Sequence, residues 1–65
     1  MKIELNGAER DIAAATVAEA LDELGFGDRR VATALNGAFL PASARPVQRL
    51  HDGDRLEVLT PMQGG

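Results

Sequence analysis

One short amphipathic helix, set between segments with the pattern of β-strands, most constrains the fold of this chain. Thr16 and Glu19 form a T-x-x-E capping box, which predicts that a helix begins after Thr16. Gly25 is placed to end it in a left-handed conformation. Four apolar residues have the spacing of one helix face: Val17, Ala20, Leu21 and Leu24. A single helix of this length covers one face of one sheet and leaves the other face in water.

The first predicted element is a β-hairpin. Residues 1–6 alternate apolar and polar, which is the period of a half-buried strand. Asn6-Gly7 follows, and this pair favours a type I′ turn because both residues accept a positive φ. The return strand is expected over residues 8–13, where Ile12 is the one large apolar side chain. Much of this strand is therefore predicted to face solvent.

The second half of the chain also reads as strands and turns. Residues 31–35 have almost no polar alternation, which predicts a strand buried on both faces at the sheet centre. Prolines within residues 41–46 predict a loop or a single helical turn there. The other predicted segments are a loop at 27–30, the turn Asn36-Gly37 into Phe39 and Leu40, a short edge strand at 47–50, the turn Asp52-Gly53-Asp54 and a last strand at 55–60.

This order of elements predicts a β-grasp fold of the α+β class. A hairpin is followed by a crossover helix and by a last strand that must reach the sheet centre. We expect a mixed sheet of four to five strands with one main helix packed on one face. Residues 1–60 form the predicted domain, and residues 61–65 form a flexible C-terminal tail.

Composition excludes several classes of function for these 65 residues. There is no cysteine and a single histidine, so no disulfide, thiolate nucleophile or metal cluster is expected. The net charge of -3 and the two aromatic residues argue against nucleic acid and anionic membranes as partners. No apolar run approaches the roughly 20 residues that cross a bilayer. We expect a cytoplasmic protein without catalytic residues or a bound cofactor.

The last five residues are the strongest candidate for function. Pro61 cannot donate to a sheet ladder and so ends the last strand. Gly64 and Gly65 have no side chains to pack, and five extended residues reach at most about 17 Å. Such a tail can enter a narrow channel and present an unhindered carboxylate. Conversion of this carboxylate to an acyl-adenylate would make it reactive toward sulfur or an amine.

Other features have a functional and a structural interpretation. If Leu56 and Val58 face the helix, Leu59 lies on the opposite face, as an isolated exposed leucine or as part of a docking patch. His51 with Asp52-Gly53-Asp54 lacks the ligand spacing of a calcium loop and is predicted to be a turn. Arg29-Arg30 is a short basic spot, either solvated or paired with an acidic partner.

These residues together resemble the ThiS family of thiamine-biosynthesis sulfur carriers over essentially the whole chain. The terminal Gly-Gly on so short a chain is the most specific part of the resemblance. The segments that carry it are 1–6, Thr16-Val17, 31–37, Pro41, Asp52-Gly53-Asp54 and 59–65.

The resemblance implies a ubiquitin-like fold and a carrier role. The carboxyl of Gly65 would be adenylated by an E1-like, ThiF-like enzyme that uses ATP. It would then become a thiocarboxylate, with sulfur supplied by a sulfur-donating enzyme, and pass that sulfur to a ThiG-like thiazole synthase. Gly64 and Gln63 belong to the same tail motif, and Leu59 and Met62 are candidate partner contacts.

Other readings remain open from the residues. A small subunit of molybdopterin synthase has the same terminal chemistry on the same fold. A TGS-like binding module resembles residues 52–61, although the acidic charge and the terminal Gly-Gly argue against it. A protein modifier that forms isopeptides is a third class, for which Lys2 is the one lysine acceptor.

Overall fold

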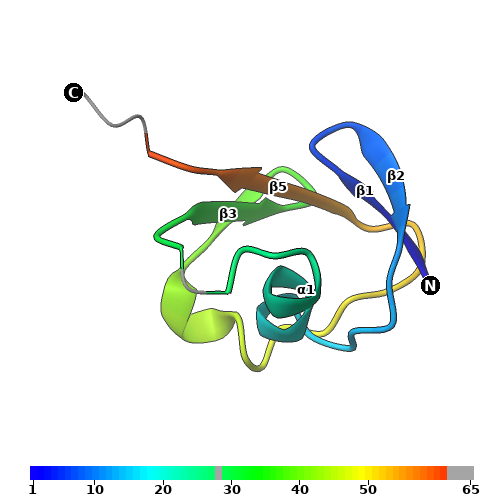
Figure 1. Cartoon of the computed structure of the whole chain (residues 1–65), viewed down its shortest axis with the longest axis horizontal. Helices are drawn as coiled ribbons and strands as arrows, with labels where there is room; N and C mark the ends of the chain where they lie inside the picture. The colour runs from blue at the N-terminus through cyan, green and yellow to red at the C-terminus, as the bar shows by residue number, and fades with distance from the viewer. Residues whose placement is uncertain (28, 62–65) are drawn as a thin grey trace.

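The computed structural model describes residues 1–27 and 29–61 of the chain. Over these residues the chain forms one five-stranded sheet with an α-helix and a short 3-10 helix (Figure 1). The elements are β1 (Lys2–Leu5), β2 (Ala8–Asp11), α1 (Val17–Glu23), β3 (Ala32–Leu35), β4 (Ala38–Leu40), η1 (Ala42–Ala44) and β5 (Arg55–Leu59). The predicted α+β class is confirmed.

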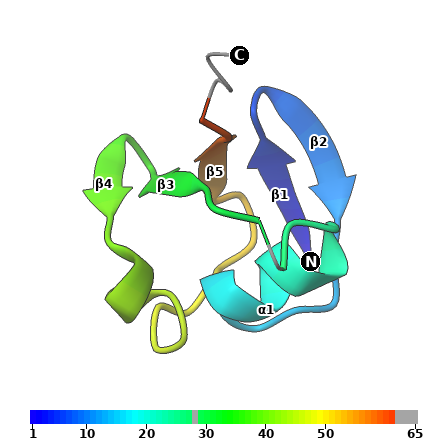
Figure 2. The ribbon, with the colours of Figure 1, turned by 60° about the vertical axis from the view of Figure 1, so that its left-hand side comes forward.

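The sheet is mixed, and its strands lie in the order β2-β1-β5-β3-β4. β1 and β5 pair in parallel, whereas the three other pairs are antiparallel. Figure 2 shows the five strands side by side in this order, with α1 across one face. The last strand thus lies at the centre, between β1 and β3. The β-grasp prediction is confirmed, with five strands.

Both Asn-Gly pairs form the predicted tight turns between antiparallel strands. Asn6 and Asn36 have φ values of 49° and 51°, and Gly7 and Gly37 each have a φ of 86°. Two successive residues with positive φ are the requirement of a type I′ turn, whose twist matches that of the flanking strands. The two hairpins β1–β2 and β3–β4 are therefore specified locally by these dipeptides.

The helix α1 begins and ends where the sequence predicted. The Thr16 hydroxyl accepts the backbone N–H of Glu19 at 3.2 Å, and the Glu19 carboxylate accepts the backbone N–H of Thr16 at 3.2 Å. Both halves of the capping box are present, which satisfies donors at the helix start. Leu24 is the C-cap, and Gly25 follows it with a φ of 92°.

The core lies between α1 and the sheet face that the helix covers. On this face, burial of apolar side chains alternates along β1 and along β5. The buried apolar residues are Ile3, Leu5, Ile12, Ala14, Val17, Ala20, Leu21, Leu40, Leu50, Leu56 and Val58. All of them lie between residues 3 and 58, so the described core is complete before the last strand ends.

The prediction that residues 31–35 form a central strand buried on both faces is wrong. β3 lies between β5 and β4, one place from the sheet edge. Thr33 is buried on the helix side, but Ala32 on the other side is exposed and Ala34 is half-buried. The error arises from the alanines of this strand. An alanine side chain has so little apolar area that leaving it exposed to water costs little free energy, so it can lie on either face of the sheet.

The prediction of an edge strand at 47–50 is also wrong. The backbone N–H groups of Val47 and Gln48 donate to the Ala44 carbonyl at 3.1 and 3.0 Å, so the chain is still turning here. Arg49 makes an isolated bridge with Thr16. The single helical turn predicted within residues 41–46 is confirmed as η1. The return strand is shorter than predicted, because β2 ends at Asp11.

Candidate functional site

The strand β5 leads to the last described residues of the chain. Leu56 and Val58 are buried in the core, whereas Leu59 is 68% exposed on the opposite face, as strand parity predicted. Thr60 and Pro61 follow and are exposed. The other predicted tail and site residues lie outside the described residues: Met62, Gln63, Gly64 and Gly65. Their roles and the predicted flexibility of 61–65 remain predictions.

Leu59 belongs to an apolar patch on the sheet face that α1 leaves open. Phe39 on β4 is 73% exposed on this face. Two small residues of β3 lie between the large ones, since Ala32 pairs with Leu59 and Ala34 pairs with Phe39. All four line a hollow of about 160 Å³, to which Thr33 and the charged Glu57 also contribute. We call Ala32, Ala34, Phe39 and Leu59 the open-face patch.

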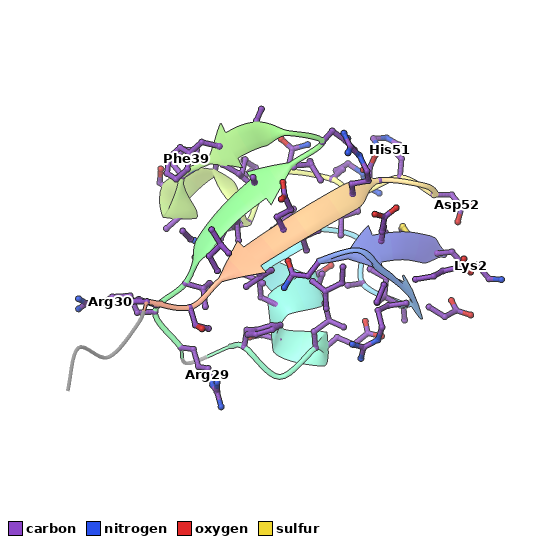
Figure 3. The ribbon with its side chains drawn as sticks, turned by 90° about the horizontal axis from the view of Figure 1, so that it is seen from above. Lys2, Arg29, Arg30, Phe39, His51 and Asp52 are labelled. Carbon is purple, nitrogen blue, oxygen red and sulfur yellow. The ribbon has the colours of Figure 1, made fainter. Side chains whose placement is uncertain are left out.

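The open-face patch has the character of a protein-docking surface. Two large apolar side chains, both more than two-thirds exposed, line the same hollow there. Figure 3 looks onto this face and labels Phe39 at its outer edge on β4. Sequence reasoning missed Phe39 as a partner for Leu59. The available signal was its alternation with Leu40, which is buried on the helix side.

The other half of the same face is charged. Lys2 and Glu4 flank the buried Ile3 on β1 and are exposed. Lys2 forms an ion pair with Glu9 of β2 at 3.3 Å, and Glu4 pairs in register with Arg55. The exposed Lys2–Glu9 ion pair contributes little stability. The charged side chains nevertheless keep this half polar, so the apolar area of the open face is confined to the side of β3, β4 and the end of β5.

Asn6 holds the end of β5 from the first hairpin turn. Its side-chain amide accepts the backbone N–H of Val58 at 2.8 Å and donates to the Val58 carbonyl at 3.0 Å. The regular β1–β5 pairing covers Glu4 with Arg55 and Leu5 with Leu56. The Asn6 side chain therefore extends this pairing by two residues toward Leu59, where backbone pairing with β1 has stopped.

We expect Asn6→Gly to loosen this strand end without disturbing the turn, because glycine also accepts the positive φ. The loss of both hydrogen bonds should lower the free energy of unfolding by about 1–2 kcal/mol in urea titration. Amide hydrogen exchange should become faster at Val58 and remain slow at Leu56, which other backbone bonds hold. Unchanged exchange at Val58 would contradict the role assigned to Asn6.

The turn at 52–54 uses its carboxylates for structure. Asp52 accepts the backbone N–H of Lys2 at 2.7 Å, and Asp54 accepts that of His51 at 2.8 Å. Burial raises the pKa of Asp54, but hydrogen bonds from Asn36 and His51 outweigh it, so this pKa lies below its usual value. The interpretation of this segment as a turn is confirmed.

The described residues offer little else for catalysis or anchoring. Within residues 1–27 and 29–61, no group of three or more His, Asp or Glu side chains is placed to hold a metal ion. In the same stretch, no helix has the length and apolar character that crossing a membrane requires. Figure 3 places His51 and Asp52 at the end of the sheet opposite to Arg30, which lies beside the end of β5.

Fold and site together define a small β-grasp protein with an exposed apolar patch beside the end of its central strand. The model of the ThiS family matches residues 3–65. The chain therefore belongs to the ThiS family, as the resemblance indicated.

Two known proteins illustrate the relationship. The sulfur carrier protein ThiS of Thermus thermophilus is 39% identical over 61 residues, which are 94% of this chain and 95% of that protein. A thiazole synthase of Paramagnetospirillum magneticum is 39% identical over 66 residues, covering 100% of this chain. The chain spans only 20% of the length of that synthase.

Solved structures agree with the fold. The crystal structure of the thiamine biosynthesis protein ThiS from Geobacter metallireducens superposes with a TM-score of 0.83, at 32% identity and with 100% of both chains covered. An NMR structure of a thiamine biosynthesis protein from the same organism gives 0.80, with 100% of this chain and 88% of that chain covered. These matches favour the thiamine branch over the molybdopterin and TGS alternatives.

Proposed function

We propose that this chain carries sulfur for thiamine biosynthesis on the terminal carboxyl of Gly65. The observation that carries the proposal is the ThiS family match over residues 3–65, which includes Gly64 and Gly65. The relative from Thermus thermophilus, which bears the name sulfur carrier protein, aligns over nearly its whole length. The open-face patch supports the same role, because a carrier must dock on other proteins.

The proposed chemistry places every reactive group except the carboxyl on other proteins. A carboxylate oxygen of Gly65 attacks the α-phosphate of ATP on the activating enzyme, and pyrophosphate leaves. Hydrosulfide, HS⁻, from the sulfur-donating enzyme then attacks the acyl carbon and displaces AMP, which leaves the thiocarboxylate and releases a proton. Glycine suits this position because no side chain hinders the carbonyl. In this scheme the chain is a protein co-substrate without catalytic residues or a bound cofactor.

Three kinds of partner follow from this scheme. An E1-like adenylyltransferase activates Gly65, a sulfur-donating enzyme supplies the sulfur, and a thiazole synthase consumes it. The thiazole synthase of Paramagnetospirillum magneticum supports the last partner, because about a fifth of its length is similar to this whole chain. We place the reaction in the cytoplasm, since adenylation consumes ATP.

The open-face patch is the proposed docking surface for the activating enzyme. Leu59 and Phe39 would pack into the enzyme surface, and the chain after Pro61 would enter its cleft. Met62 and Gln63 would contact the walls of that cleft on the way to Gly65. This arrangement places the recognition surface and the entering chain side by side, because Leu59 directly precedes Thr60 and Pro61.

Intact-mass spectrometry of the protein from cells that make their own thiamine tests the proposal. We expect a second species that is heavier by the mass difference between sulfur and oxygen, and fragmentation should assign the change to Gly65. Cells in which added thiamine represses synthesis of the pathway enzymes are the control, and there the heavier species should be absent. Detection of the carboxylate form alone, while the thiazole is being made, would contradict sulfur carriage by this chain.

A further inference from the structure

Two arginines line a hollow at the point where the chain leaves β5. Arg29 and Arg30 belong to the loop between α1 and β3, and together with Thr60 and Pro61 they line a space of about 490 Å³. Figure 3 shows Arg30 beside the end of the β5 ribbon, with Arg29 on the loop below it and its side chain pointing in a different direction. We call these four residues the basic hollow.

The register of the sheet explains why the basic hollow lies at the end of β5. β3 and β5 are antiparallel, and Ala32 pairs with Leu59. Continued by one and two residues, this register sets Val31 opposite Thr60 and Arg30 opposite Pro61. The loop is tied to the body on both sides, since the Phe26 N–H donates to the Leu21 carbonyl of α1 at 2.7 Å and Arg45 donates to the Val31 carbonyl at 2.7 Å.

The charge of the basic hollow opposes that of the whole chain, which is -3. Loop residues 25–30 contain two arginines and one acidic residue, Asp28, and residues 60–65 contain no charged side chain. Within residues 1–27 and 29–61, neither Arg29 nor Arg30 forms an ion pair; the same holds for Arg10, Arg49 and Arg55, so these two are distinguished by their position beside Thr60 and Pro61. The two guanidinium groups are exposed at the root of the tail.

We propose that the basic hollow binds carboxylate side chains at the mouth of the activating enzyme's cleft and so orients the carrier as its tail enters. The inference builds on the proposed function. Guanidinium groups pair with carboxylates through two parallel hydrogen bonds, which fixes orientation as well as proximity. Because the chain is acidic overall, most of its surface repels an acidic rim on the enzyme, whereas the basic hollow attracts it. The enzyme is therefore expected to make contact at the hollow, beside Thr60 and Pro61.

A protein rim fits the position better than the phosphates of ATP. Four residues separate Pro61 from the carboxyl of Gly65, and an extended tail of that length spans about 14 Å. The nucleotide reacts at the far end of this span. The basic hollow, at its near end, meets the entrance of the cleft.

Association with the cognate activating enzyme tests the inference when two charge-matched variants are compared. R29E/R30E reverses the charge of the basic hollow. R10E/R49E lowers the net charge of the chain by the same amount, but it does so on β2 and beside Thr16. At about 0.01 M ionic strength we expect R29E/R30E to associate about 10-fold more slowly than R10E/R49E. The gap should shrink at about 0.15 M, where the Debye length falls from about 30 Å to about 8 Å.

Two further measurements separate charge from folding. R29K/R30K retains the charge and should associate within about 3-fold of the unmodified chain, but its complex should dissociate faster, because lysine keeps the long-range attraction and cannot form the two parallel hydrogen bonds. Thermal unfolding should be the same for all variants, and the maximal rate of adenylation at saturating carrier should be unchanged. Equal slowing of both reversal variants, or slowing that is independent of salt, would overturn the inference.

The same assay separates this inference from the proposed function. If the unmodified chain receives no AMP from the enzyme, the proposed function fails whatever the association rates are. If the chain is adenylated but both reversal variants associate equally, only the role of the basic hollow fails. Binding of free ATP to the chain that is lost in R29E/R30E would assign the hollow to phosphate and would also overturn the inference.

Discussion

A chain that ends at Gly64 is expected to accept no AMP from the activating enzyme and to unfold at nearly the same temperature as the full chain. The reacting carboxyl would be displaced by one residue, and misplacement of reacting atoms costs about 100-fold or more in rate. Within residues 1–27 and 29–61, the buried apolar residues all lie between residues 3 and 58, so the deletion should leave the core unchanged. We expect the unfolding midpoint to shift by less than about 2 °C.

Two matched chains sharpen this experiment. Addition of one alanine after Gly65 leaves the whole sequence present but moves the carboxyl outward, and it should abolish adenylation as the deletion does. Gly65→Ala retains the position of the carboxyl and adds only a methyl group, so it measures how narrow the cleft is. Adenylation of the extended chain at the normal rate would rule out Gly65 as the carrying residue.

Leu56→Ala is expected to unfold much of the protein at room temperature. Leu56 is completely buried on the central strand β5, and truncation of such a leucine removes about 2–5 kcal/mol. A domain of this size, without disulfides, has only a few kcal/mol in total. Urea titration followed by circular dichroism should therefore show a much lower midpoint, or no folded baseline at all.

Leu59→Ala is the control three residues along the same strand. Leu59 is 68% exposed, so the free energy of unfolding should change by less than about 0.5 kcal/mol. The same substitution should weaken binding to the activating enzyme about 5- to 10-fold, as loss of an apolar interface anchor does. Destabilisation as large as that of Leu56→Ala would show that the assignment of the two sheet faces is wrong.

The parts of the fold that were predicted correctly are those that neighbouring residues decide. The capping box needs only Thr16 and Glu19, three residues apart, and each Asn-Gly turn needs one dipeptide. Burial along β5 alternates with strict period two, so the opposite directions of Val58 and Leu59 were readable before pairing was known. Each of these features depends on residues within its own segment and needs no partner from elsewhere in the chain.

Most errors and omissions concern partners that are distant in sequence; the edge strand predicted at 47–50 is the exception, because local hydrogen bonds to Ala44 keep the chain turning there. Alanines of β3 gave no sign of which face is open, because they are tolerated on both. Phe39 was not recognised beside Leu59, since only the β4–β3–β5 register joins them. The Glu23 carboxylate accepts the N–H groups of Ala13 and Ala14, a contact that no pattern in the sequence announces.

By itself, the order of residues determined a β-grasp chain with a capped helix, two hairpins and a last strand with one exposed leucine. The sequence also placed the last strand at the sheet centre, but only the tertiary structure decided that its neighbours there are β1 and β3, which gathers the open-face patch and the basic hollow around the end of that strand. The physical reason is that periodicity specifies which way a side chain points. The choice of neighbour is made by packing of the whole sheet against α1.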